Sequence, residues 1–206
     1  MRGCFTVSEV SRTLGISQKT VKDYFWYIQK TFIVHKVTPY FKNIRKEITK
    51  SPVFYFYDLG LRNYAIGAFG NVGSPHEMGL IFENFVFNIL KEKFQNTSTE
   101  IHFWRTKDGA EVDFVIDSGR TQFPVEVKYR ELKRIEMSRS FRSFIEKYHP
   151  KKAYIINLGL DKDLTLRNTK IYFIRYARKP QAFKPGDEWH PGTKPVLAGA
   201  VEENQA

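Results

Sequence analysis

The sequence predicts an α+β/α/β protein with two folded parts, a helix-turn-helix with a strand hairpin followed by a mixed sheet flanked by helices. Two short amphipathic helical patterns, joined by a turn that contains glycine, open the chain. Two strand-like apolar runs follow them, and then a long apolar helical pattern at about residues 78–90. The later order of strand, strand, strand, helix, strand, strand is typical of a sheet with helices packed on it.

The first predicted part, residues 1–70, begins with the helix-turn-helix. Its first helix is expected to start near Val7, because Thr6 and Glu9 have capping-box spacing. A tight turn at Gly15 then leads to a second helix of about residues 18–30. Helical spacing predicts a buried stripe on the second helix, made of Val21, Tyr24, Phe25 and Ile28.

Strand-like runs at about residues 32–37 and 53–57 are expected to pair as a hairpin, which completes a winged helix-turn-helix. We expect this part to contact duplex DNA by neutralising phosphates. The basic residues placed for that role lie on the second helix and on the wing: Lys19, Lys22, Lys42, Arg45 and Lys46. The alternative is a packing or protein-interaction module whose charges are only solvated.

Glycine and proline make residues 66–75 a loop and the expected domain boundary. Asp58, before it, is interpreted as a turn or cap residue. The second predicted part spans residues 76–176, with strands at about 101–105, 111–116 and 123–129, a helix at 139–148 and two further strands. Residues 177–206, rich in proline and glycine, are expected to be an extended or disordered tail.

Composition limits the classes of function. The 206 residues carry a formal net charge of +11, which favours a polyanionic partner such as DNA. No apolar run approaches the roughly 20 residues that span a bilayer, so no membrane partner is expected. The single cysteine, Cys4, excludes an intrachain disulfide and fits a reducing cytoplasm. No Gly-rich P-loop motif is present, so the chain itself is not expected to hydrolyse ATP.

Acidic residues within apolar strands are the strongest indication of chemistry. Asp113 interrupts one strand pattern, and Glu126 interrupts the next, followed two residues later by Lys128. A buried charge costs several kcal/mol unless it is compensated, and a divalent cation can compensate it. Side chains two residues apart on a strand share a face, so Glu126 and Lys128 are predicted to point the same way. Glu83, within the long apolar helix, adds a fourth candidate.

Asp113, the Glu126-Val127-Lys128 element and a preceding helix with Glu83 resemble the PD-(D/E)XK nuclease superfamily. Val112 stands where the proline that names the superfamily would lie. Segments 54–63, 79–84, 103–107 and 111–114 look like the C-terminal region of a bacterial and archaeal AAA-type ATPase family. In that family a P-loop ATPase domain precedes a winged helix and a nuclease-like domain of unsettled function.

The resemblance implies a role for each of the acidic residues and the lysine. Asp113, Glu126 and Glu83 would bind Mg²⁺ or Mn²⁺, and Lys128 would be the catalytic lysine. Glu111, on the same strand as Asp113, is expected to assist the site or to form a salt bridge, and Trp104 is expected to be core or a nucleic-acid contact. Arg105 is a candidate clamp for nucleic acid.

Two functions therefore remain open from the sequence. The first is a metal-dependent DNase, and the second is a noncatalytic DNA- or protein-binding module with a vestigial nuclease site. In either case an ATPase domain, in cis or in trans, is the implied partner.

Overall fold

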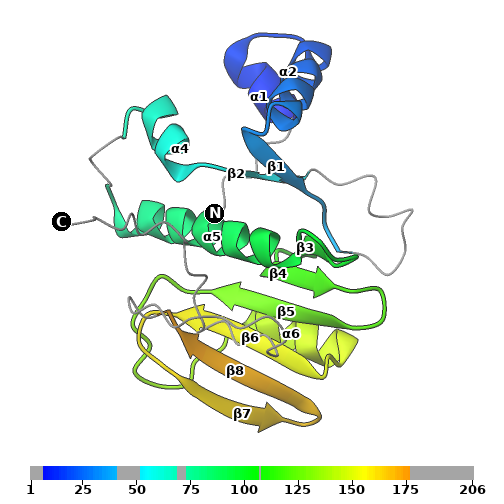
Figure 1. Cartoon of the computed structure of the whole chain (residues 1–206), viewed down its shortest axis with the longest axis vertical. Coiled ribbons are helices and arrows are strands. Elements are labelled where there is room, and N and C mark those ends of the chain that lie inside the picture. Colours follow the sequence, from blue (N-terminus) through cyan, green and yellow to red (C-terminus); the bar gives the residue numbers. More distant parts are fainter. Residues whose placement is uncertain (1–6, 41–51, 69–72, 107, 177–206) are drawn as a thin grey trace, which may run out of the picture.

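The computed structural model describes residues 7–40, 52–68, 73–106 and 108–176. Figure 1 shows a small helical unit above the long helix α5, with a twisted sheet on the other side of that helix. The predicted wing residues Lys42, Arg45 and Lys46, the cap residue Thr6 and the predicted tail of residues 177–206 lie outside the described residues.

The N-terminal unit is a pair of helices followed by a pair of antiparallel strands, as predicted. Its elements are α1 (Val7–Leu14), α2 (Gln18–Lys30), β1 (Val34–Val37), β2 (Val53–Phe56) and α4 (Leu59–Ala65). Helix α4 was not among the predicted elements. Its cap was recognised, however, because the backbone N–H of Leu61 donates to the Asp58 carboxylate over 2.7 Å.

The structure confirms the predicted bounds of helix α2 but only part of its predicted buried stripe. Ser17 caps the helix by accepting a hydrogen bond from the N–H of Thr20, and Val21 is buried. Tyr24 is 61% exposed, so its assignment to the core was wrong. The helix packs against α1 and β1, and that narrow contact leaves the edge of the stripe at Tyr24 in solvent.

The second unit is a mixed sheet flanked by helices, as predicted, and it has six strands where five were predicted. Its elements are α5 (Pro75–Phe94), β3 (Glu100–Arg105), β4 (Glu111–Asp117), β5 (Gln122–Val127), α6 (Arg139–Tyr148), β6 (Lys152–Asn157), β7 (Lys162–Leu166) and β8 (Thr169–Arg175). The spatial order is β3-β4-β5-β6-β8-β7. The first three strands are antiparallel to one another, β5, β6 and β8 are parallel, and β7 is an antiparallel edge.

Strand β7 was not predicted. Its residues are exposed or half-buried, so its sequence lacks the apolar run that marks the central strands. An edge strand needs only one ladder of hydrogen bonds, and here β8 supplies it.

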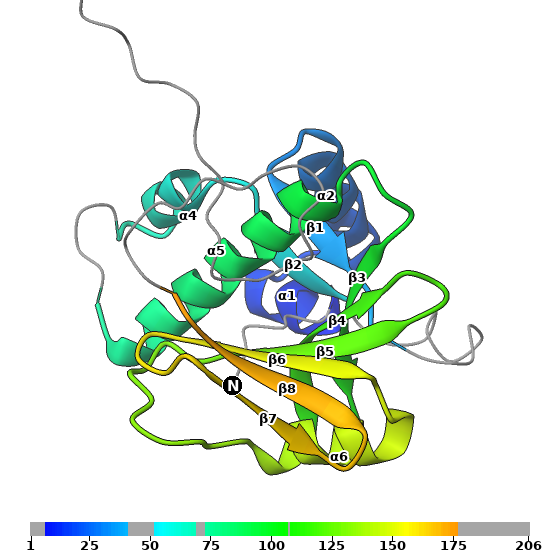
Figure 2. The same ribbon diagram turned by 60° about the horizontal axis from the view of Figure 1, so that its bottom comes forward.

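The sheet has a separate hydrophobic cluster on each face. One cluster joins the sheet to α5 and to the small β1–β2 sheet, and the other joins it to α6. Figure 2 shows α5 and α6 on opposite sides of the strands. Helix α5 begins with a capping box between Ser74 and Glu77. Its buried apolar residues are Phe82, Val86, Phe87 and Leu90. Of the five positions that helical spacing predicts to be buried, Leu90 is buried, and Leu80, Ile81, Phe85 and Ile89 are half-buried.

A buried asparagine ties the N-terminal unit to the second unit. The Oδ1 of Asn84 accepts a hydrogen bond from the N–H of Phe56 at 2.9 Å, and its Nδ2 donates to the Phe56 carbonyl at 2.8 Å. The side chain thus satisfies both backbone groups of a residue in β2, as a neighbouring strand would do. No helix in the described ranges is both long enough and apolar enough to cross a bilayer.

Candidate active site at the end of strand β5

Strand β4 contains one extra residue next to β3, and Asp113 lies at that point. His102 pairs with Val115, but Trp104 pairs with Val112, so two steps along β3 match three steps along β4. This is a β-bulge, a feature that bends a strand and redirects its side chains. Val112 and Val115 consequently both pack in the α6 cluster. Strand periodicity alone does not indicate the bulge, because a bulge depends on how β4 pairs with its neighbour.

The carboxylate of Asp113 accepts a hydrogen bond from the backbone of β5. The pairing of β4 with β5 extends only as far as Phe114 opposite Val125. Beyond it, the N–H of Val127 donates to Asp113 Oδ2 over 2.5 Å. A charge-assisted bond of this kind fixes the carboxylate firmly. It holds Asp113 against the backbone of the residue that follows Glu126.

Glu126 and Lys128 form a half-buried ion pair on one face of β5. Lys128 Nζ lies 3.2 Å from Glu126 Oε1, and their side chains are 18% and 12% exposed, respectively. Their predicted shared face is confirmed. The other carboxylate oxygen, Glu126 Oε2, is buried and has no hydrogen-bond partner in the described part of the chain. A buried oxygen without a partner carries a desolvation cost of about 1–3 kcal/mol, more when it is charged.

Glu83 is engaged elsewhere. Its Oε1 accepts a hydrogen bond from the Tyr55 hydroxyl at 2.6 Å, and Tyr55 belongs to the α5-side cluster. Among residues 7–40, 52–68, 73–106 and 108–176, no three His, Cys, Asp or Glu side chains form a group that could hold a metal ion. The structure therefore places the Asp113 carboxylate on the backbone of Val127, next to Glu126 in the sequence, and forms no three-residue ligand group with Glu83 in the described ranges.

Glu111 and Arg105 form a salt bridge across β3 and β4. Arg105 Nη2 lies 3.0 Å and 3.1 Å from the two oxygens of Glu111. This is one of the two outcomes expected for Glu111, and it engages the guanidinium that was the candidate clamp. Trp104 is 2% exposed, and its Nε1 donates to the Tyr148 hydroxyl, so its role as a core residue is confirmed.

A basic loop follows Lys128. Arg130 and Arg134 both bind Glu136, and these contacts, first the hydrogen bond from Arg134, lower the pKa of Glu136. Lys133 is exposed in the same loop. The segment from Arg130 to Glu136 lines a hollow of about 370 Å³. The loop thus carries three cations shortly after Lys128 in the sequence, and Glu136 pairs with two of them. On α2, the predicted DNA-contacting residues Lys19 and Lys22 are exposed as well.

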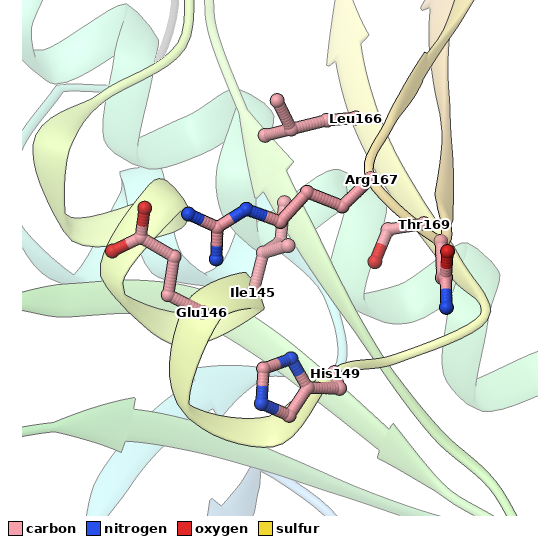
Figure 3. Close-up of a pocket in the computed structure, with 7 residues that line it drawn as sticks. Ile145, Glu146, His149, Leu166, Arg167 and Thr169 are labelled. Atoms are coloured by element: carbon pink, nitrogen blue, oxygen red, sulfur yellow. The ribbon is translucent and has the colours of Figure 1, made fainter.

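A separate hollow of about 240 Å³ lies between the end of α6 and the β7–β8 turn. Figure 3 shows Arg167 and Glu146 reaching over it, with His149 at its rim. Thr169 in its wall donates to the Pro150 carbonyl at 2.6 Å. Asp113, Glu126 and Lys128 do not line this hollow, so it is distinct from the predicted site.

Sequence reasoning missed a set of exposed aromatic residues in the N-terminal unit. Trp26, Tyr27 and Phe32 are 57%, 58% and 72% exposed. Large rings are usually buried, so grouped exposure indicates contact with another molecule. A helical projection of α2 would have found two of them, because Trp26 and Tyr27 lie opposite the Val21–Phe25–Ile28 stripe.

Two family models match the chain, one over the N-terminal unit and one over the sheet unit. Residues 78–176 match the model of a domain of unknown function, DUF4143, and residues 2–71 match that of a second, DUF8612. The chain is also 28% identical over 141 residues to uncharacterized proteins of Mycobacterium bovis and Mycobacterium tuberculosis. That alignment covers 68% of this chain and spans 31% of the length of each relative. The six-stranded sheet with α5 and α6 is therefore the part of the molecule that resembles DUF4143.

Proposed function

We propose that this protein binds nucleic acid and hydrolyses its phosphodiester bonds with a divalent cation at Asp113 and Glu126. The proposal assigns the N-terminal unit as a winged helix and the sheet as a PD-(D/E)XK-like domain. The observation that carries it is Glu126. One oxygen of this buried carboxylate pairs with Lys128, and the other has no partner in the described residues.

The donor set fits Mg²⁺ or Mn²⁺ with two protein ligands. Mg²⁺ is commonly held by one or two carboxylates and completes its shell with water and phosphate oxygens. Asp113 and Glu126 lie on neighbouring strands, and the bond from the Val127 N–H holds Asp113 in place. When bound, the cation would polarise the phosphate and lower the pKa of a bound water.

The residues of the chain supply the remaining chemistry. Lys128 places an ammonium group where negative charge develops on the phosphate, and its low exposure strengthens that interaction. Arg130, Lys133 and Arg134 attract the nucleic-acid backbone toward the end of β5, and the exposed Lys19 and Lys22 on α2 bind phosphates elsewhere along it.

The test is nicking of a supercoiled plasmid with Mg²⁺ or Mn²⁺. We expect the Asp113→Asn and Lys128→Met variants to lose activity by about 100-fold or more. Asp117→Asn is the matched control, because Asp117 lies at the other end of β4 and its carboxylate accepts a bond from the Gly119 N–H. Equal rates for wild type and the Asp113→Asn variant would refute hydrolysis at this site.

A second candidate function is a noncatalytic DNA- or protein-binding module of an AAA-type ATPase, with a vestigial nuclease site. It is favoured by the bond between Glu83 and Tyr55, which occupies the third predicted ligand. An ATPase domain in cis or in trans would then be the partner. In the same assay this function predicts inert wild-type protein that still shifts DNA on a gel, with binding reduced by charge reversal at Lys19 and Lys22.

A further inference from the structure

We propose that the pocket between Phe32, Tyr57 and helix α5 binds a nucleobase, either of a free nucleotide or of an unstacked base in a strand. The inference does not depend on the proposed hydrolysis, because none of its residues belongs to the carboxylate site. The pocket measures about 420 Å³, within the range typical of small-ligand sites. Its lining residues are Phe32, His35, Tyr57, Asn88, Lys91, Glu92 and Gln95.

Phe32 lies at the mouth of the pocket, just after helix α2. Its φ of 57° belongs to a Schellman-type helix end, in which the N–H of Ile33 donates to the Ile28 carbonyl and the N–H of Phe32 donates to the Gln29 carbonyl. Its ring is 72% exposed and meets Tyr57 edge-on, at 6.0 Å between centroids. The ring therefore contributes little to the core and is accessible to a ligand.

The far wall is a rigid aromatic stack. The rings of Tyr57 and His35 lie 3.4 Å apart and nearly parallel, and His35 meets the edge of Phe87 at 5.2 Å. Burial, and then the charge of Lys91, lower the pKa of His35 to about 4. The imidazole is therefore neutral at physiological pH and behaves as a flat ring. Phe32 and Tyr57 lie at 81° to each other, so a planar ligand can stack on the face of one ring and meet the edge of the other.

Asn88 supplies a directed acceptor. Its Nδ2 donates to the Tyr57 carbonyl at 3.0 Å, which fixes the orientation of the amide. Its Oδ1 is buried, and no described residue offers it a hydrogen bond. Buried acceptors normally have partners, so this one requires an explanation. A ring N–H or amino group of a base would satisfy it after a small side-chain adjustment.

The remaining polar residues carry one charge of each sign. Asn88, Lys91 and Glu92 lie on α5, and Gln95 is its C-cap. Lys91 can pair with a phosphate at the exposed rim, while Glu92 and Gln95 can bind sugar hydroxyls or base edges. An apolar ligand would leave Asn88 unpaired, and a simple anion would meet the Glu92 carboxylate and make no use of Phe32 and Tyr57. A base joined through a sugar to a phosphate offers a partner to each of these groups.

The test is equilibrium titration in EDTA, so that metal-dependent binding and hydrolysis cannot contribute. The probes are AMP, GMP, CMP and UMP in one arm and a short single-stranded oligonucleotide in the other. We expect Phe32→Ala to weaken binding about tenfold, equivalent to about 1.4 kcal/mol. Lys91→Ala should weaken nucleotide binding about threefold and leave adenosine binding unchanged. Tyr64→Ala, an equally exposed aromatic on α4, is the matched control.

The two arms distinguish the sources of the base. Binding of mononucleotides supports a free nucleotide, and binding of the oligonucleotide alone supports a base within a strand. In both cases Phe32→Ala must weaken binding while its thermal unfolding matches that of wild type. If no probe binds, or if Phe32→Ala and Lys91→Ala bind as wild type does, the inference is overturned. Because Asp113→Asn should leave these affinities intact, loss of plasmid nicking would not affect the result.

Discussion

Trp26 and Trp104 are residues of the same type in opposite environments. Trp104 on β3 is 2% exposed and packs edge-on against Phe144, whereas Trp26 on α2 is 57% exposed beside Tyr27. The sheet unit uses its aromatic rings to fill two clusters. The N-terminal unit leaves several of its rings in water, interspersed with lysines. The difference indicates that burial of aromatic rings stabilises mainly the sheet unit, whereas the N-terminal unit exposes rings of the same kind to solvent.

The largest expected effect is on the two tryptophans themselves. Trp104→Ala should lower the free energy of unfolding by about 3–5 kcal/mol, because it removes a large buried ring. Trp26→Ala should change it by no more than about 0.5 kcal/mol. Urea denaturation of both variants checks the comparison. Similar losses would mean that the N-terminal unit is as dependent on its aromatic residues as the sheet.

A smaller effect is expected where the two units meet. Asn84→Leu removes the partner of both backbone groups of Phe56. Leaving them unsatisfied should cost about 2–3 kcal/mol. Asn96→Leu, at an exposed position beyond α5, is the control and should be nearly neutral. The measurement is hydrogen exchange of β1 and β2 together with urea denaturation, and unchanged protection in Asn84→Leu would show that the units are joined by other contacts.

The charged pair of β5 should respond asymmetrically to substitution. Lys128→Met leaves a buried carboxylate without its cation and should cost about 2 kcal/mol. Glu126→Gln removes that charge and should change stability by no more than about 1 kcal/mol. Thermal unfolding with and without Mg²⁺ checks this, and Mg²⁺ should restore part of the loss in Lys128→Met. An equal loss in both variants would indicate an ordinary ion pair.

The smallest effect concerns pH. The pKa of His35 is about 4 in the folded state, below its usual value of 6.5. As pH falls, the unfolded chain therefore takes up a proton at His35 before the folded chain does. The stabilisation linked to neutral His35 is fully present above about pH 6.5 and is lost between pH 6.5 and 4. Allowing for partial exposure, the loss is about 1 kcal/mol. His35→Phe should abolish this part of the pH dependence in urea titrations at pH 7 and pH 4.5, and an unchanged slope would contradict it.

Much of the architecture could be predicted because its signals are local. Cap residues and helical spacing placed α2 and α6, and apolar runs placed the central strands. The edge strand β7 could not be found this way, because partial exposure removes the pattern. Tyr24 was wrongly assigned to the core. Helical spacing shows which side of a helix is buried, but the width of the buried face depends on the elements that pack against it.

The candidate site likewise has features that could be predicted from the sequence and features that could not. Glu126 and Lys128 share a face because of strand periodicity, and that could be predicted. The bulge at Asp113 and its bond to the Val127 N–H depend on how three strands meet. The partner of Glu83, Tyr55, is 28 residues away in β2, and no local pattern connects them. The pocket lined by Phe32, Tyr57 and α5 could not be predicted for the same reason, because segments far apart in the sequence build it.

The most direct test of the proposed function is the binding of Mn²⁺, measured by calorimetry on wild type, Glu126→Gln and Asp117→Asn without nucleic acid. The account predicts one site in wild type and in Asp117→Asn, and its loss, or weakening by about tenfold or more, in Glu126→Gln. Wild-type protein that binds no Mn²⁺, or a Glu126→Gln variant that binds it equally well, would contradict the assignment of a cation to Asp113 and Glu126.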